Sequence, residues 1–549
     1  MAPRYAVVDL FAGPGGLAEG FASVRIDGRS PFSIVLSVEK EESAHQTLLL
    51  RTFLRQFGGK FPREYYQFLN GEISEPDWEK LYPIHWKAAA AEALRLELGS
   101  RKASSKLDGL IDDIRRKHGN NIILIGGPPC QAYSLVGRAR NKGIEGYEAS
   151  ADQRHFLYRE YIRILRRLQP AAFVMENVKG MLSSSVDGER IFDRVLSDLR
   201  AVGEGQDSYE IVTVAPRRKI PNAEKSRHPI SAEFVVRAEE FGIPQARHRV
   251  IVVGLRKSCV RSLGDDFFLK GLLAPSDTAR TTVRDVLGGL PRLRSGLSKG
   301  DDSATWKNTV ADAINAVARL EPGMSKTELQ AFRARARHYA RSFISSAPRT
   351  RIGNRSGGMV RSCPEKLRRW LTDTALKRLP NDDTRSHMES DLGRYFFAAL
   401  YGEIMGISPK ASDFPTPLAP RHRNWETGKF ADRFRVQLWD LPSTTVTSHI
   451  SKDGHYFIHP DPLQCRSLTV REAARLQTFP DNYFFKGNRT QQFVQVGNAV
   501  PPYLARLMAE SLYRVLIQGV EKQKTKAATE PTSLDKNSVM QNRTATATT

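Results

Sequence analysis

Short apolar runs alternate with amphipathic helical patterns along roughly the first 255 residues of the chain. The helical pattern at 155–168 places Tyr161, Ile164 and its leucines on one face and its arginines mostly on the other. Alternation of this kind predicts a parallel α/β sheet with crossover helices. The expected strands are residues 5–10, 33–38, 122–125, 172–175 and 250–253.

The pattern becomes irregular after about residue 273, which predicts a second structural unit. The helices expected in the rest of the chain are residues 392–405, 469–478 and 502–517. An Asp-Gly pair within 452–455 predicts a hairpin turn, and the polar helical stretch at 75–116 predicts an insertion. From residue 521 the composition is typical of a disordered tail. We expect the units 1–274, 275–440, 441–520 and 521–549, of which the third returns to the first.

The formal net charge of +23 predicts a polyanionic partner, most simply nucleic acid. The excess is concentrated at residues 333–369, which contain ten arginines and one lysine against a single acidic residue. Arginine favours bidentate contacts with phosphate or guanine, so Arg351 and Arg355 are candidates for contacting DNA. A solvated basic surface without a DNA contact is the alternative that the composition leaves open.

No apolar stretch approaches the ~18 residues of a membrane span, and the first residues lack the layout of a signal peptide. The four cysteines (Cys130, Cys259, Cys363 and Cys465) lie far apart, which argues against disulfides and against a zinc cluster. The sequence therefore predicts a cytoplasmic protein with no metal and no membrane partner.

Residues 9–16, Asp-Leu-Phe-Ala-Gly-Pro-Gly-Gly, follow the first expected strand and precede a helical pattern. Glycines at this place let the backbone approach a ligand at the helix N-terminus. The spacing differs from the dinucleotide fingerprint and no P-loop lysine follows, so NAD and ATP are disfavoured. Glu39 ends the second expected strand, where its carboxylate can accept hydrogen bonds from ribose hydroxyls.

Two prolines separate the third expected strand from Cys130. Because proline fixes φ and donates no hydrogen bond, the strand must end there and the chain must turn outward. A thiol at the carboxyl edge of an open α/β sheet is typical of a nucleophile, and a buried cysteine that only packs is the alternative. Glu176 ends the fourth expected strand at the same edge. Before the fifth, Arg247 and Arg249 alternate with His248 and share one side, where either arginine is alternatively a structural ion-pair partner.

Taken in order, six motifs of the chain resemble those of the DNA (cytosine-5) methyltransferase family. They are DLFAGPGG at 9–16, GGPPCQAYS at 126–134, ENV at 176–178, QARHR at 245–249, SLTVREAARLQTFPD at 467–481 and GNAVPP at 497–502. The resemblance implies a Rossmann-like S-adenosylmethionine-dependent methyltransferase sheet with helices on both faces. It also implies a separate mixed target-recognition domain.

The resemblance further implies transfer of a methyl group from S-adenosylmethionine to C5 of a cytosine in double-stranded DNA. Cys130 would add to C6 of the base, because C5 is otherwise too weak a nucleophile. Glu176 would stabilise the charge that builds at N3, and Arg247 and Arg249 would bind the base O2 and the catalytic loop. The implied cofactor contacts are Phe11, Gly13, Gly15, Gly16, Glu39, Pro129 and Asn498. The Asp-Ile pair with which the family holds adenine has its nearest match in Glu72 and Ile73.

The target base must leave the duplex, because C6 is hidden inside it. The segment after Cys130 contains Arg138 and Arg140 between flexible residues, which predicts a mobile basic loop that closes over DNA. Gln131 and Ser134 lie at its start and are further candidate DNA contacts. A plain surface loop is the alternative.

Enzymes of this layout often protect DNA from a companion restriction endonuclease, so we expect the modification component of a restriction-modification system. Two other functions stay open. One is an RNA cytosine-5 methyltransferase, and the other is an inactive homologue that only binds nucleic acid.

Overall fold

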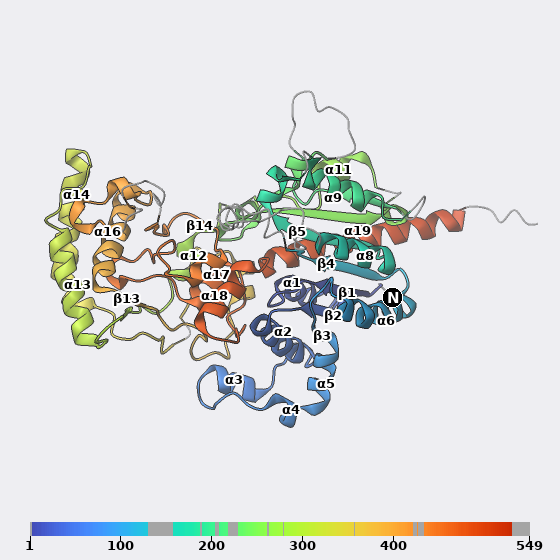
Figure 1. Ribbon diagram of the computed structural model, residues 1–549, viewed down its shortest axis with the longest axis horizontal. Coiled ribbons are helices and arrows are strands. Elements are labelled where there is room, and N and C mark those ends of the chain that lie inside the picture. Colours follow the sequence, from blue (N-terminus) through green and yellow to red (C-terminus); the bar gives the residue numbers. More distant parts are fainter. Residues whose placement is uncertain are drawn as a thin grey trace, which may run out of the picture.

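An eight-stranded sheet forms the centre of the computed structural model, with strand order β3-β2-β1-β4-β5-β11-β8 and β9 paired to β11 (Figure 1). The residues that the structure describes are 3–129, 157–186, 189–203, 208–217, 229–260, 263–277, 279–355, 357–420, 425 and 433–529. Within them, no helix combines the length and the apolar character that crossing a membrane requires.

All five strands expected from the apolar runs are present in this sheet. They are β1 (Tyr5–Leu10), β2 (Phe32–Glu39), β4 (Ile122–Gly126), β5 (Ala172–Val178) and β11 (His248–Arg256). The first four pair in parallel, but β11 runs antiparallel to β5, so the expectation of an all-parallel sheet was wrong at this edge. Three strands were not predicted because their runs are short: β3 (Ala93–Arg95), β8 (Tyr209–Val212) and β9 (Val235–Arg237).

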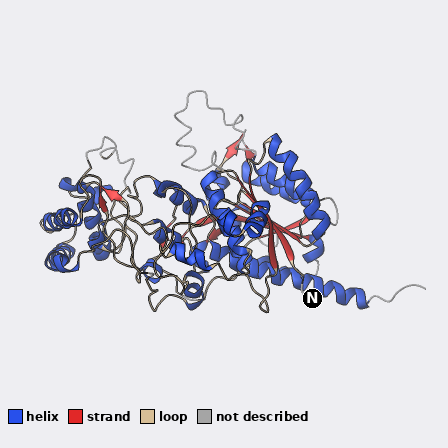
Figure 2. Cartoon of the chain, turned by 90° about the horizontal axis from the view of Figure 1, so that it is seen from below, coloured by secondary structure: helices blue, strands red, loops and turns tan. Residues whose placement is uncertain are grey.

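Helices cover both faces of the sheet, as Figure 2 shows. One face packs against α6 (Arg101–His118), α8 (Leu157–Leu168) and α9 (Ile191–Arg200). The other packs against α1 (Gly16–Ser23) and α19 (Pro502–Thr529). A Cβ atom at Gly20 would lie 2.5 Å from Cβ of Ala505, so the first and last helices of the chain touch closely. The fold class predicted from sequence, an α/β sheet between helices, is confirmed.

The helix predicted at 155–168 is α8 over its described part, and Tyr161, Ile164, Leu165 and Leu168 are buried as the pattern indicated. Residues 75–116 are not one insertion, because β3 belongs to the sheet and α6 packs beneath it. The part that projects from the sheet comprises α3 (Arg63–Leu69), α4 (Trp78–Leu81) and α5 (Pro83–Glu92), with α2 (Glu42–Arg55) between them and the sheet (Figure 1).

A second region, which we call the outer region (residues 291–440), extends to the end of the molecule opposite the sheet (Figure 1). Its main helices are α13 (Ser303–Val317), α14 (Lys326–Ser346) and α16 (Glu389–Met405), whereas α15 (Glu365–Leu371) packs Leu367 and Leu371 into the apolar cluster of the sheet half. Trp306, Phe332 and Phe397 belong to a separate apolar cluster there. Helix α16 confirms the prediction at 392–405, whereas the domain boundaries themselves stay a prediction.

The chain then returns to the sheet through α17 (Val470–Leu476), α18 (Arg489–Asn498) and α19. Short strands pair the two parts of the chain: β10 (Gln245–Ala246) runs beside β14 (Ser443–Thr444). The hairpin expected at 452–455 was wrong, because no strands flank the turn and Asp453 instead accepts a hydrogen bond from the backbone N–H of His455 at 3.0 Å. Helix α19 continues to Thr529 and so extends into the part of the chain expected to be the tail, whose start stays a prediction.

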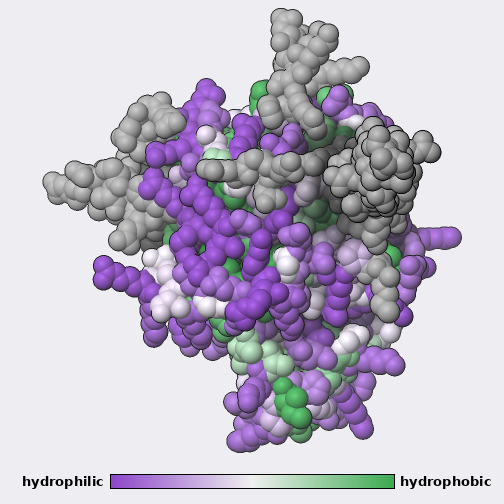
Figure 3. All heavy atoms as spheres, turned by 90° about the vertical axis from the view of Figure 1, so that its right-hand side faces the viewer, coloured by the Kyte–Doolittle hydropathy of each residue, from purple (hydrophilic) through white to green (hydrophobic). Residues whose placement is uncertain are grey.

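The surface seen from the sheet end of the molecule is largely hydrophilic (Figure 3). Hydrophobic residues reach it at the lower end, where Figure 1 places α3 to α5. Leu81 and Ile84 on these helices are exposed.

Candidate active site

The glycine-rich turn between β1 and α1 has a backbone suited to close approach by a ligand. Phe11, Gly13 and Gly15 have positive φ angles of 56°, 56° and 98°. A Cβ atom at Gly16 would lie 2.5 Å from the carbonyl oxygen of Val500, so only glycine fits where α1 begins. A Cβ atom at Gly13 would have no described atom within 4 Å, so the turn faces open space there. The N-terminus of α1 therefore opens beside the carboxyl end of β1, as a site for a polar ligand requires.

Glu39 is fixed against this turn by its own carboxylate. The backbone N–H of Gly13 donates to Oε2 at 2.8 Å, and the backbone N–H of Glu41 donates to Oε1 at 2.7 Å. Each carboxylate oxygen can accept more than one hydrogen bond, so both keep capacity for ribose hydroxyls.

Asp9, the last acidic residue of β1, is fully buried, and within the described residues neither carboxylate oxygen has a hydrogen-bond partner. Burial raises the pKa of Asp9 to about 8, with Arg55 opposing the shift. Asp9 belongs to the DLFAGPGG motif, but the sequence alone did not single it out from the other motif residues. Its burial without a hydrogen-bond partner is visible only in the structure.

The adenine side of the site differs from the expectation. Glu72 and Ile73 follow α3 in an exposed loop, and Glu72 Oε1 lies 2.6 Å from Nζ of Lys377. The acidic residue next to the end of β3, beside Glu39, is Glu97, whose Oε1 lies 2.8 Å from Nζ of Lys40. Placement therefore favours Glu97 over Glu72. The sequence did not reveal it because the three residues of β3 are too short a run to recognise.

The end of β4 and the end of β5 meet at the expected catalytic edge. Asn177 Nδ2 donates to the carbonyl oxygen of Pro128 at 3.0 Å, and a Cβ atom at Gly127 would lie 3.2 Å from Oε2 of Glu176. The Pro128-Pro129 segment is thus held against the strand that carries Glu176. Cys130, to which this segment leads, lies outside the described residues.

Glu176 forms an ion pair with Arg249, whose Nε lies 3.0 Å from Oε1. The antiparallel pairing of β5 with β11 brings the two residues together, because Arg249 stands opposite Val178. Burial lowers the pKa of Arg249, and the carboxylate of Glu176 counteracts that shift. The pair places a carboxyl group and a guanidinium side by side at the sheet edge.

Arg247 has a different environment and is only 2% exposed. Its Nη1 donates to the carbonyl oxygen of Val446 at 2.7 Å, and its Nη2 donates to that of Gly497 at 3.1 Å. Burial lowers the pKa of Arg247, with Arg249 as the next cause. Arg247 therefore ties together three segments, one of which ends in the exposed Asn498. Its contact with a base stays a prediction.

The candidate DNA contacts also differ in their surroundings. Arg351 is committed to protein: its Nη1 lies 2.8 Å from Oδ2 of Asp301, and its Nη2 donates to the carbonyl oxygen of Thr384 at 2.8 Å. Arg355 is exposed. Gln131, Ser134, Arg138 and Arg140 lie outside the described residues.

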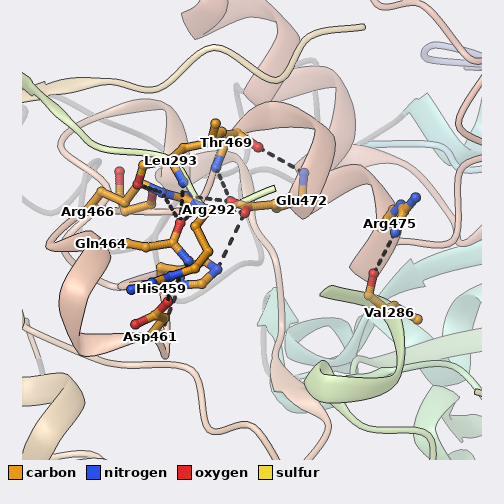
Figure 4. Close-up of polar contacts among 11 residues, drawn as sticks. Val286, Arg292, Leu293, His459, Asp461, Gln464, Arg466, Thr469, Glu472 and Arg475 are labelled. Carbon is orange, nitrogen blue, oxygen red and sulfur yellow. Dashed lines mark hydrogen bonds and ion pairs between the residues drawn. The ribbon is translucent and has the colours of Figure 1, made fainter. Parts of the chain in front are cut away.

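A buried polar cluster joins the two segments by which the chain enters and leaves the outer part of the molecule, near residue 293 and at residues 459–472 (Figure 4). Both Nη atoms of Arg466 lie 2.7 Å from the carboxylate oxygens of Glu472, and Arg466 Nε also donates to the carbonyl oxygen of Leu293 at 3.2 Å. His459 lies 3.5 Å from the same carboxylate, and its Nδ1 accepts from the backbone N–H of Asp461 at 3.1 Å. Arginine and histidine groups lower the pKa of Glu472 to about 2, despite its burial.

Comparison with known proteins defines the class to which this fold and site belong. The sequence profile of the C-5 cytosine-specific DNA methylase family matches residues 101–514. The chain belongs to this family, and it is therefore by class a DNA (cytosine-5)-methyltransferase.

The relatives extend over nearly the whole chain. Type II methyltransferase M.Bpa9945I of Bacillus paralicheniformis is 31% identical over 93% of this chain and 99% of the relative. DNA (cytosine-5-)-methyltransferase M.ApeKI of Aeropyrum pernix is 26% identical over the same shares of the two chains. A solved E. coli prophage protein, described as a DNA modification methyltransferase, aligns with a TM-score of 0.51 at 19% identity over 93% of this chain and 99% of that chain, which supports the shared fold.

Proposed function

We propose that the protein methylates C5 of a cytosine within a specific duplex DNA sequence, through a covalent adduct with Cys130, as the modification enzyme of a restriction-modification system. The observation that carries the proposal is the Glu176–Arg249 pair beside the segment that leads to Cys130. The names of the relatives support the role in restriction-modification, because M.Bpa9945I is a type II methyltransferase.

The chemistry begins with the Cys130 thiolate, which forms an S–C6 bond with the cytosine ring. The electron pair of the C5–C6 double bond then makes C5 nucleophilic, while Glu176 donates a hydrogen bond or a proton to N3. Arg249, 3.0 Å from Glu176, holds that carboxyl group in place and can donate to the base O2. After C5 has gained the methyl group, water accepts the C5 proton, the electron pair of that C–H bond re-forms the C5–C6 double bond, the S–C6 bond breaks and the thiolate leaves, while N3 returns its proton to Glu176.

S-adenosylmethionine supplies an electrophilic methyl group when it is bound. The turn at Gly13 and the carboxylate of Glu39 fit a ligand with ribose hydroxyls, and Phe11, Gly15, Gly16 and Pro129 line the adjoining edge in our proposal. Asn498 is the last residue of α18, and Arg247 holds this end of the helix through the Gly497 carbonyl. Glu97 is our candidate for the adenine amino group.

The test is expression of the gene in cells that lack cytosine methylation, followed by bisulfite sequencing of plasmid DNA. We expect 5-methylcytosine at one short sequence motif and none in cells expressing Cys130→Ala. Unmethylated DNA with a soluble, cofactor-binding protein, or equal methylation by Cys130→Ala, would refute the proposal. Parallel assays on DNA and RNA of the same sequence separate DNA methylation from RNA methylation.

A further inference from the structure

The helices that project below the sheet reach across to the outer region. We call residues 63–75 the brace segment and residues 373–379 the docking strip. Asn70 contacts the strip in both directions: its Nδ2 donates to the carbonyl oxygen of Ala375 at 3.3 Å, and its Oδ1 accepts from the backbone N–H of Lys377 at 2.7 Å. Gly71 has a φ of 72°, and a Cβ atom there would lie 2.6 Å from the guanidinium carbon of Arg378. The two segments therefore fit closely along their backbones.

Apolar packing continues this contact. Leu376 and Leu379 of the docking strip share a buried cluster with Phe53, Tyr65 and Trp78. The rings of Phe68 and Phe484 lie 4.9 Å apart, centroid to centroid. An interface with both a buried apolar part and specific hydrogen bonds is a fixed contact rather than a passing one.

Asp373 is the junction of this interface. Its Oδ2 accepts from the Tyr66 hydroxyl at 2.9 Å and from Asn482 Nδ2 at 2.7 Å. Its Oδ1 accepts from the backbone N–H of Ala375 at 3.0 Å, which shapes the docking strip itself. One carboxylate thus connects the strip, the brace segment and the segment that follows α17.

The junction continues to the cofactor turn. Asn482 Oδ1 accepts from Arg51 Nη1 at 3.1 Å, and Arg51 forms a buried bidentate pair with Glu19 of α1, at 2.9 and 2.6 Å. The adjacent Tyr483 donates its hydroxyl to the carbonyl oxygen of Pro14, in the glycine-rich turn, at 2.5 Å. Every step from the docking strip to the cofactor turn is a direct hydrogen bond, an ion pair or a peptide bond.

We infer that Asp373 and Tyr66 are positioning residues, which hold the outer region at a set placement relative to the cofactor turn through the brace segment. The inference rests on the proposed function, because it takes the outer region to be the part that contacts DNA. Helix α15, directly before the docking strip, packs Leu367 and Leu371 into the apolar cluster of the sheet half. The brace extends this attachment over residues 373–379, so the part of the outer region that continues from the strip is held against the sheet half.

The decisive variant is Tyr66→Phe, which removes one donor to Asp373 and leaves the aromatic packing. We expect the KM for DNA to rise roughly fivefold, as for the loss of one ordinary hydrogen bond, with kcat and cofactor affinity unchanged. Asp373→Asn, which keeps an acceptor oxygen, should raise the KM less than Asp373→Ala.

The matched control is Tyr82→Phe. The Tyr82 hydroxyl donates to Glu64 Oε2 at 2.8 Å, so it lies in the same projecting helices but contacts no residue of the docking strip through that bond. An equal KM for DNA in Tyr66→Phe and wild type, an equal change in Tyr82→Phe, or a loss of cofactor binding together with DNA binding would each overturn the inference.

A second measurement needs neither DNA nor activity. Asn70→Ala removes the acceptor for the backbone N–H of Lys377, so hydrogen exchange at residue 377 should speed up at least tenfold, while exchange in β1 stays unchanged. Unchanged exchange at residue 377 refutes the brace, whereas absent methylation by the wild-type protein refutes the proposed function instead.

Discussion

The inside of the sheet half and its junction with the outer region are stabilised by different kinds of interaction. In the sheet half, strands such as β4 are buried on both faces, and polar side chains gather at the strand ends. At the junction with the outer region, a buried charged pair binds segments from both parts: Arg466 pairs with Glu472 and donates to the carbonyl oxygen of Leu293. Apolar burial is non-directional and tolerates small shifts, whereas a buried ion pair requires one geometry. The sheet therefore positions the candidate catalytic side chains, and the polar cluster sets how the outer region joins the rest of the protein.

Glu176→Gln tests the sheet side of this comparison and has the largest expected effect. Removing the proton donor proposed at N3 should lower kcat by about 10²- to 10⁴-fold while DNA affinity stays near that of wild type, and loss of the charged partner of Arg249 should also lower the unfolding midpoint. Single-turnover kinetics with the mapped DNA sequence measure the step. A kcat within tenfold of wild type would remove Glu176 from the mechanism.

Arg466→Met tests the polar side. Loss of this guanidinium leaves the buried carboxylate of Glu472 unpaired, which should lower the free energy of unfolding by about 3–5 kcal/mol. Urea unfolding measures the change. The control is Arg369→Met, because the pair of Arg369 with Glu365 is exposed, and its loss should cost less than about 1 kcal/mol. Equal effects of the two variants would show that the buried pair contributes no more to the free energy of unfolding than the exposed one.

The same cluster predicts how stability depends on pH. Burial lowers the pKa of His459 from 6.5 to about 4. The unfolded chain therefore takes up a proton as the pH falls below 6.5, while the folded chain resists until about pH 4. Stability that is present above pH 6.5 should fall by about 2 kcal/mol between pH 7 and pH 5. His459→Asn should flatten this slope in urea unfolding, and an unchanged slope would assign the pH dependence elsewhere.

Substitutions of Arg351 and Arg355 should have different effects on stability and DNA binding, and these are the smallest effects expected. Arg351→Ala should lower the unfolding midpoint, because it breaks the contacts with Asp301 and Thr384. Arg355→Ala should leave stability unchanged and weaken DNA binding by about 1 kcal/mol or more, in a salt-dependent manner. Binding titrations at two salt concentrations distinguish the outcomes. If both variants change only stability, neither arginine contacts DNA.

The sheet could be predicted because its information is local. Apolar runs bounded by glycine and proline fixed β1, β2, β4, β5 and β11, and the residues at their ends followed from the motifs. The antiparallel direction of β11 could not be predicted, since it depends on how the connections through β8 and β9 return the chain. Glu97 did not emerge as a candidate for a similar reason, because β3 is recognisable only through its pairing with β2.

The polar contacts that join distant segments could not be predicted for a different reason. They connect residues far apart in the chain, such as Arg466 with Leu293 and Arg247 with Val446. No periodicity in the sequence indicates which arginine is buried among carbonyl oxygens and which faces solvent. Arg247 and Arg249 are two residues apart and occur in one motif, yet one holds backbone segments together and the other pairs with Glu176.

The central claim is a covalent bond between Cys130 and C6 of the target cytosine. Duplex DNA carrying 5-fluorocytosine at the mapped site tests it directly, because fluorine at C5 blocks the final proton loss. With S-adenosylmethionine present, we expect a one-to-one protein–DNA adduct that survives denaturation, maps to Cys130 by mass spectrometry and is absent from Cys130→Ala. No adduct on DNA that is methylated when it carries ordinary cytosine, or an adduct on another residue, would contradict the account.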